Sequence, residues 1–308
     1  MKQNPTTPKA PPAPPEWMKA KIKFATPAND TVREVRQNIQ TGGLQTVCEE
    51  ASCPNLQHCW GRGTATFLIM GNVCTRSCKF CDIATGRPKP LDTTEPLRLA
   101  KTIQRMNLKH AVITSVDRDE LKDCGSTHFA ACVVETKRVN PNTTVEVLMP
   151  DFKAQPDSLQ RIFDAKPHII NHNLETVPSL YKEICPQSNY ERSLEVLRRS
   201  KEAGFLTKTG LILGLGETRT EVEQVIRDAR KVGVRLLTIG QYLQPSPNHA
   251  PLKEYATPET FEELKYFALK LGYMYVESGP MVRSSYHAAD IREILLKNGV
   301  EIAENTIN

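Results

Sequence analysis

The chain has 308 residues, of which 39% are hydrophobic and 24% charged, and its formal net charge is +5. This profile excludes a disordered or fibrous protein, and without a basic run we expect no nucleic-acid partner. No stretch approaches the roughly 18 apolar residues of a membrane span, and the N-terminus lacks the apolar core of a secretion signal. We therefore expect a cytoplasmic protein without membrane contact.

The first 63 residues lack the periodicity of helices and strands. Residues 1–16 are rich in proline, which favours an extended and solvated chain, so we predict a flexible arm there. Residues 17–63 carry three cysteines among many polar side chains. We expect them to form an N-terminal extension whose order depends on what the cysteines bind.

Short apolar runs then alternate with helical patterns. The predicted strands span residues 64–70, 110–116, 143–149, 168–174, 206–213 and 235–241. Before the last of them, Val222, Val225, Ile226 and Ala229 follow the i, i+3, i+4, i+7 spacing of an amphipathic helix. This alternation predicts a parallel sheet with outer helices, either an α/β barrel or an open doubly wound sheet.

Six predicted strands favour an incomplete barrel over a closed eight-stranded one. The predicted fold class is α/β, a partial (β/α)6 TIM-like barrel over residues 64–272 with a C-terminal extension over residues 273–308. In both kinds of α/β fold, ligands gather at the carboxyl ends of the strands.

Six of the nine cysteines lie between Cys48 and Cys81. In a long chain without a secretion signal, clustered cysteines bind metal or carry out chemistry more often than they form disulfides. The other three, Cys124, Cys132 and Cys185, are scattered, and we predict packed or surface thiols at these positions.

Cys74, Cys78 and Cys81 form a C-x3-C-x2-C triplet on the loop after the first predicted strand. Iron–sulfur clusters commonly have four cysteine ligands, so three on one loop leave an iron open to another ligand. A structural zinc site fits less well, because zinc usually takes four protein ligands and no second C-x2-C or His pair lies nearby.

With Phe80 as the aromatic residue before its third cysteine, this loop resembles the radical S-adenosylmethionine superfamily. The resemblance implies a 4Fe–4S cluster whose open iron binds S-adenosylmethionine and whose electron cleaves it to methionine and a 5′-deoxyadenosyl radical. It also implies that Gly214, in a G-x-I-x-G-x-x-E pattern, supports the adenosyl group. A tight βα turn is the alternative reading of such a glycine-rich string.

Further cofactor-binding candidates follow the second and fourth predicted strands. Thr114 and Ser115 occupy the place where the superfamily contacts the methionine moiety, although the common Gly-Gly-Glu form is absent here. Asn171, Asn173 and Glu175 are candidates for hydrogen bonds to ribose or carboxylate groups. Ordinary structural hydrogen bonds would account for each of these three equally well.

Upstream, Cys48, Cys53 and Cys59 form a C-x4-C-x5-C triplet, again one ligand short of a four-iron cluster. Buried structural cysteines are the alternative, but the intervening residues are too polar for a core segment. A second 4Fe–4S cluster is therefore predicted.

The pairing of the two triplets resembles the lipoyl synthase family. The same resemblance extends over nearly everything after residue 14 and includes residues 114–121, 146–152, 171–176, 208–217, 240–245 and 283–288. It implies that Ser285 is the fourth ligand of the second, auxiliary cluster. An alkoxide is a poorer match than a thiolate for iron in a sulfide cluster, so it could be released when that cluster is dismantled.

The resemblance further implies sulfur insertion at carbons six and eight of an octanoyl group on a lipoyl carrier domain, with the auxiliary cluster as sulfur donor. The implied partners are the octanoylated lipoyl domains of 2-oxoacid dehydrogenases and the glycine cleavage H protein, an electron donor such as flavodoxin or ferredoxin, and an iron–sulfur carrier. Biotin synthases, RNA methylthiotransferases and two-cluster electron carriers are the rival classes. Biotin synthases lack the upstream triplet, and the RNA enzymes need a further RNA-binding domain. Electron carriers saturate their irons with cysteine.

Overall fold

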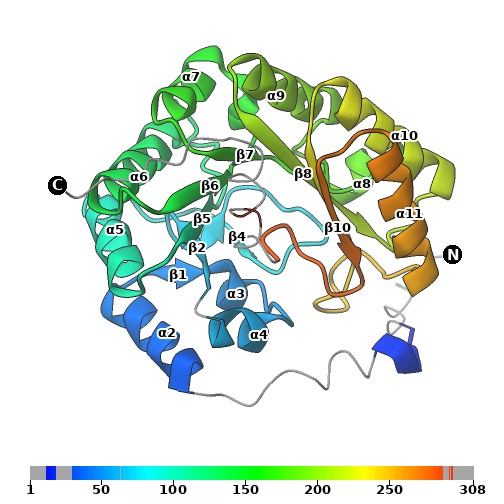
Figure 1. Ribbon diagram of the computed structural model, residues 1–308, viewed down its shortest axis with the longest axis horizontal. Helices are drawn as coiled ribbons and strands as arrows, with labels where there is room; N and C mark the ends of the chain where they lie inside the picture. The colour runs from blue at the N-terminus through cyan, green and yellow to red at the C-terminus, as the bar shows by residue number, and fades with distance from the viewer. Residues whose placement is uncertain (1–11, 19–29, 63, 287–290, 292, 294–308) are drawn as a thin grey trace, which may run out of the picture.

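An eight-stranded sheet forms the centre of the computed structural model, which describes residues 12–18, 30–62, 64–286, 291 and 293 (Figure 1). The strands lie in the order β1-β2-β5-β6-β7-β8-β9-β10. Their bounds are β1 (Gln45–Thr46), β2 (Thr66–Ile69), β5 (His110–Ser115), β6 (Thr144–Leu148), β7 (Ile169–Asn171), β8 (Leu206–Leu213), β9 (Leu236–Gln241) and β10 (Tyr275–Gly279). Among the described residues β1 and β10 do not pair, so the barrel is open between them.

The predicted partial α/β barrel is confirmed. Each of the six predicted strands is present within its range, as β2, β5, β6, β7, β8 and β9, and each pairs in parallel with the next. Two further strands of this sheet were not predicted: β1 pairs antiparallel with β2, and β10 pairs in parallel with β9. β1 has only two residues, and β10 buries only Val276, so neither carries an apolar run.

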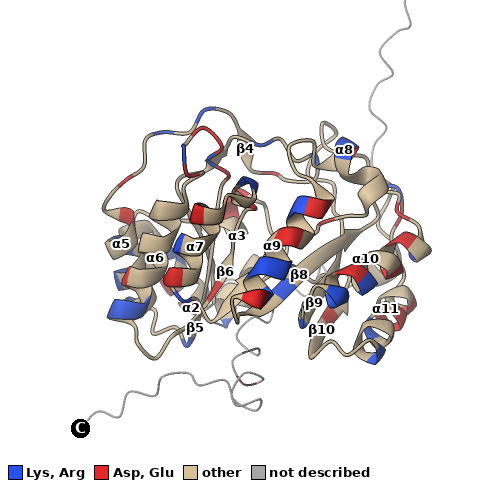
Figure 2. Cartoon of the chain, turned by 90° about the horizontal axis from the view of Figure 1, so that it is seen from above, with Lys and Arg blue, Asp and Glu red and all other residues tan. Residues whose placement is uncertain are grey.

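Helices surround the sheet on its outside (Figure 1). They are α5 (Glu95–Arg105), α6 (Ser126–Val139), α7 (Pro156–Asp164), α9 (Tyr190–Glu202), α10 (Arg219–Lys231) and α11 (Pro258–Lys270). The predicted apolar stripe of α10 is buried, and a capping box of Thr218 and Glu221 begins the helix. Basic and acidic residues are interspersed over the described helices (Figure 2).

Apart from α2, the remaining elements are short. Before β2 lie α2 (Asp30–Thr41), α3 (Val47–Glu50) and α4 (Leu56–Gly61). The others are β3 (Val73–Cys74), β4 (Ala84–Thr85), η1 (Phe152–Ala154), η2 (Pro178–Leu180) and α8 (Tyr181–Ile184). None of the described helices is both long and apolar enough to cross a membrane. Most of the predicted proline-rich arm, and the C-terminal extension beyond residue 286 except residues 291 and 293, lie outside the described residues.

Candidate iron–sulfur active site

The loop of residues 74–81, which we call the cluster loop, leaves the carboxyl end of β2. Its three cysteines face one another closely enough that Cys74 and Cys78 raise the pKa of Cys81 electrostatically. Burial is the larger cause, and it raises the pKa of Cys74 to about 11 and that of Cys81 to about 12. The metal-free thiols of Cys74 and Cys81 are therefore protonated at neutral pH, and binding iron would release their protons.

Arg76 fastens the cluster loop to the carboxyl ends of β5 and β6. Its guanidinium is almost fully buried and donates to Asp119 at 2.8 Å and to Asp151 at 2.6 Å, with Asp117 at 3.2 Å. Asp151 also accepts from Arg192 of α9 at 2.6 Å. Burial raises the pKa of Asp117 to about 6, against the lowering effect of Arg76. Sequence spacing did not indicate this network, because it joins residues more than forty positions apart.

The backbone of the loop is held as well. The thiol sulfur of Cys74 accepts from the amides of Asp117 at 3.3 Å and Arg76 at 3.4 Å. The amide of Lys79 donates to the carbonyl of Ile184 at 2.7 Å. This contact places the buried Cys185 beside Cys78, and the hydrogen bond between their thiols raises the pKa of Cys185. Of the packed or surface thiol predicted at Cys185, the structure shows a packed one, but its position against the cluster loop was not predicted.

The candidate cofactor contacts lie at the same edge of the sheet. Thr114 Oγ1 donates to the carbonyl of Leu148 at 2.7 Å, whereas Ser115 Oγ is buried without a hydrogen-bond partner among the described residues. Asn173 Nδ2 donates to Ser284 Oγ at 2.6 Å. Thr114 and Asn173 thus have structural hydrogen bonds, whereas the Ser115 hydroxyl has none among the described residues. Phe80 packs against the core formed by β8, β9, α10 and α11.

Gly214 lies in the left-handed region at φ +104°, and a Cβ there would come within 2.3 Å of Gln241 Nε2 and 2.6 Å of the Glu254 carbonyl oxygen. Its amide and that of Leu215 donate to the carboxylate of Glu217 at 2.6 and 2.9 Å. Only glycine fits this turn at the end of β8. The turn accounts for the glycine by itself, so its support of an adenosyl group stays a prediction.

Glu175 gives the site a pH dependence that can be measured on the cluster-free protein. Burial raises its pKa to about 7, and a hydrogen bond from Asn173 offsets part of the rise. Between about pH 4.5 and 7 the unfolded carboxyl ionises while the folded one stays protonated, so stability falls as pH rises. Glu175→Gln should therefore raise the free energy of unfolding by at most about 3 kcal/mol at pH 8 and by much less at pH 5.

Urea unfolding of both proteins across this pH range measures the difference, with Glu183→Gln on an exposed residue of α8 as the matched control. A gain that is the same at pH 5 and pH 8 would show that ionisation of Glu175 is not its cause.

The upstream triplet of Cys48, Cys53 and Cys59 lines one pocket together with Ser285. Cys48 lies in α3 and Cys59 in α4, and burial raises their pKa values to about 11 and about 12. Asn55 Nδ2 donates to the carbonyl of Met281 at 2.6 Å and so fastens the N-terminal extension to the segment before Ser285. Three thiols and one hydroxyl, from segments over two hundred residues apart, thus line one pocket, which we call the auxiliary pocket.

Polar residues of the barrel interior reach this pocket. Thr66 Oγ1 lies 2.6 Å from Ser285 Oγ. His110 also lines the pocket, and its Nε2 is 3.4 Å from Glu146 Oε2. The other carboxylate oxygen of Glu146, Oε1, accepts from Lys208 Nζ at 2.8 Å. Asn171 Nδ2 donates to the same oxygen of Glu146 at 3.1 Å, so this predicted contact is engaged inside the barrel.

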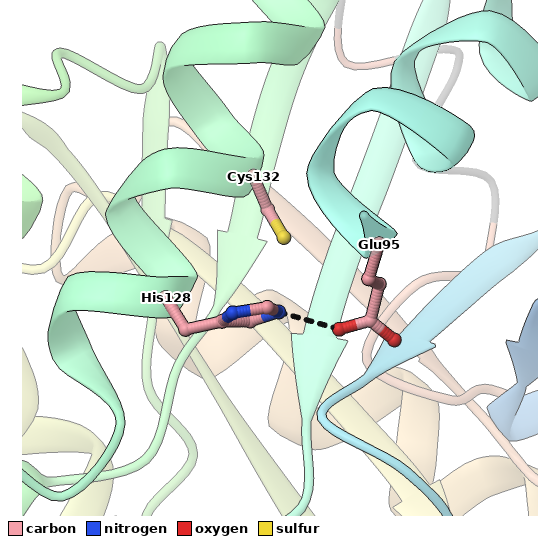
Figure 3. Close-up of side chains that lie close together, drawn as sticks. All are labelled: Glu95, His128 and Cys132. Carbon is pink, nitrogen blue, oxygen red and sulfur yellow. Dashed lines mark hydrogen bonds and ion pairs between the residues drawn. The ribbon is translucent and has the colours of Figure 1, made fainter. Parts of the chain in front are cut away.

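A third group of potential metal ligands, Glu95, His128 and Cys132, joins α5 to α6 (Figure 3). Glu95 Oε2 lies 2.7 Å from His128 Nε2 and accepts from the amide of Met70 at 3.0 Å. These contacts satisfy the carboxylate and explain the group as a buried link between two helices and β2. Cys132 is fully buried there, which is one of the two settings predicted for it, a packed or a surface thiol.

Comparisons with known proteins show which family the chain resembles. The family model described as the radical SAM superfamily matches residues 68–229, more than half of the chain. A lipoyl synthase of Leptospira biflexa is 53% identical over 285 residues, which are 92% of this chain and 91% of that protein. A lipoyl synthase of Rubrobacter xylanophilus is 51% identical over 281 residues, 91% of this chain and 86% of that protein.

Among solved structures, methylornithine synthase shares the fold with a TM-score of 0.52. It is 13% identical, and the match covers 91% of this chain and 95% of that one. At this identity the likeness concerns the fold alone.

Proposed function

The chain belongs to the lipoyl synthase family of the radical S-adenosylmethionine superfamily, and we propose that its two cysteine triplets divide the work of sulfur insertion between them. The cluster loop would hold the 4Fe–4S cluster that binds S-adenosylmethionine. The auxiliary pocket would hold a second 4Fe–4S cluster through the upstream triplet and Ser285. The product is an octanoyl group that carries sulfur at carbons six and eight.

The observation that carries this proposal is the convergence of the upstream triplet and Ser285 on one pocket. Three thiols and one hydroxyl fit the donor set of a cluster that must later give up an iron, because the hydroxyl oxygen is the weakest of the four ligands. The cluster loop itself carries three thiols and no fourth cysteine, which fits a cluster that must bind a small molecule. Cys185 beside Cys78 belongs to the packed core rather than to the loop.

The substrate requires this kind of chemistry. Carbons six and eight of an octanoyl chain are neither acidic nor polarised, so acid–base and nucleophilic catalysis have nothing to act on. When bound, the two clusters and S-adenosylmethionine supply the radical and the sulfur. The protein fixes the two sites: Arg76 and its aspartates hold the cluster loop, while Asn55 holds the auxiliary pocket together.

For the cofactor we propose that Ser115 uses its unpaired buried hydroxyl, and that Thr114, Asn171, Asn173 and Glu175 contribute from the same sheet edge. Phe80 and Gly214 would shape the walls around it. The proposed partners are octanoylated lipoyl domains of 2-oxoacid dehydrogenases and the glycine cleavage H protein, flavodoxin or ferredoxin as reductant, and an iron–sulfur carrier. A cytoplasmic location is part of the same proposal.

The direct test is anaerobic incubation of the reconstituted protein with S-adenosylmethionine, a strong reductant and an octanoylated carrier peptide. We expect 5′-deoxyadenosine together with a peptide that has gained two sulfur atoms. An electron carrier would release no 5′-deoxyadenosine. Release of 5′-deoxyadenosine without any sulfur in the peptide would keep the radical chemistry and reject this substrate.

A further inference from the structure

We propose that Thr66 is a positioning residue that donates its hydroxyl hydrogen to Ser285 and thereby holds the serine oxygen in the auxiliary pocket, where it would ligate iron. This inference rests on the proposed function, since it takes Ser285 as a ligand of the auxiliary cluster. The two hydroxyl oxygens are 2.6 Å apart, although 219 positions separate the residues in the chain.

The position of Thr66 suits this role. It is the first residue of β2, which lies inside the sheet between β1 and β5, and its side chain is almost fully buried. Its neighbour on β5 in the pairing register, Val112, lines the same pocket. The donor is therefore carried by a strand paired on both sides, whereas Ser285 lies in a turn after the last strand of the sheet.

The chemistry sets the direction of the effect. A serine oxygen that ligates iron would carry negative charge, and a hydrogen bond to a charged oxygen is about twice as strong as one to a neutral oxygen. Thr66 would therefore hold the ligating serine more firmly than the unbound one. A second hydroxyl in the pocket, Thr64 Oγ1, donates instead to the carbonyl of Cys59 at 2.8 Å. Thr64 therefore offers a matched control two residues away.

The test measures how fast the full-length protein, loaded with both clusters, loses iron to a bathophenanthroline chelator under anaerobic conditions. Thr66→Val removes the hydroxyl at nearly constant volume and should speed iron loss from the auxiliary cluster about tenfold. Thr66→Ser keeps a hydroxyl and should stay near the parent rate. Cys78→Ala, which lacks the other cluster, identifies the phase of iron loss that belongs to the auxiliary pocket.

Three further rates of iron loss show whether the effect of Thr66→Val comes from its hydrogen bond to Ser285. Thr64→Val should leave the auxiliary phase within about twofold of the parent, because its hydroxyl bonds the backbone. In a Ser285→Cys background, where a thiolate replaces the alkoxide, Thr66→Val should add little. The phase that belongs to the cluster loop should be unchanged in every threonine variant.

The Ser285 and Thr66 variants separate the ligand assignment of Ser285 from the role of Thr66. If Ser285→Ala leaves iron loss unchanged, Ser285 is not a ligand, and both the ligand assignment and this inference are overturned. If Ser285→Ala speeds iron loss but Thr66→Val does not, the role of Thr66 alone is overturned. Equal effects of Thr64→Val and Thr66→Val would also reject it, since the hydrogen bond to Ser285 would then have no part in the result.

Discussion

Replacing Cys53 with alanine is expected to lower formation of the lipoyl product at least about a hundredfold while S-adenosylmethionine cleavage continues. Even the outer partners of metal ligands typically change affinity or activity 10- to 100-fold, so loss of a ligand should exceed that range. Cleavage should continue because the cluster loop is held by its own contacts, from Arg76 to the aspartates after β5 and β6. Cys53 is the suitable member of its triplet because, unlike Cys48, it is only partly buried.

Two other cysteine variants complete the comparison. Cys78→Ala should abolish both 5′-deoxyadenosine and lipoyl product, because it removes a ligand from the cluster loop. Cys132→Ala, a buried cysteine outside both sites, should retain both activities at some cost in stability. Chromatography of 5′-deoxyadenosine and mass spectrometry of the peptide measure the two outputs in one reaction. Equal loss of both outputs in Cys53→Ala would contradict the division of labour between the triplets.

Lys208→Met should lower the free energy of unfolding by about 3–5 kcal/mol, because it leaves Glu146 as an uncompensated charge inside the barrel. Both side chains are fully buried and their charged atoms are 2.8 Å apart. Burial alone would raise the pKa of Glu146, but the charge of Lys208 and the contact with His110 outweigh it and hold that pKa below its ordinary value. The carboxylate is thus ionised at neutral pH and depends on its partner.

Urea unfolding of the cluster-free protein measures this loss. The double variant Lys208→Met with Glu146→Gln should recover much of it, because no buried charge remains. Lys201→Met, on an exposed residue of α9, should change stability by no more than about 0.5 kcal/mol. Two results would show that the Glu146 carboxylate does not depend on the charge of Lys208. One is a loss below about 1 kcal/mol for Lys208→Met; the other is a double variant that is no more stable than Lys208→Met alone.

Much of the scaffold was predictable because apolar periodicity is a local signal. The strands β2, β5 and β6 fall within their predicted ranges, and the buried stripe of α10 follows its spacing. β10 was missed because its buried and half-buried residues do not form an apolar run, and only pairing with β9 makes it a strand.

The site, too, was only partly predictable from the sequence. The cysteine spacings were readable because each triplet lies within twelve residues, and Ser285 was reached only through the family resemblance. The partners of these ligands could not be read from spacing. Arg76 meets Asp151 and Thr66 meets Ser285 only after the barrel has brought distant strand ends together. Such contacts depend on register and side-chain direction, which no short motif records.

We expect the cluster of the auxiliary pocket to supply both sulfur atoms of the product. To test this, the clusters are rebuilt with heavy-isotope sulfide, and the protein then makes a single anaerobic turnover on an octanoylated carrier peptide in a medium that contains only light sulfide. Mass spectrometry should find a lipoyl peptide with two heavy sulfur atoms, and no such product from Cys53→Ala. A product with light sulfur would show that the sulfur does not come from a cluster of this protein.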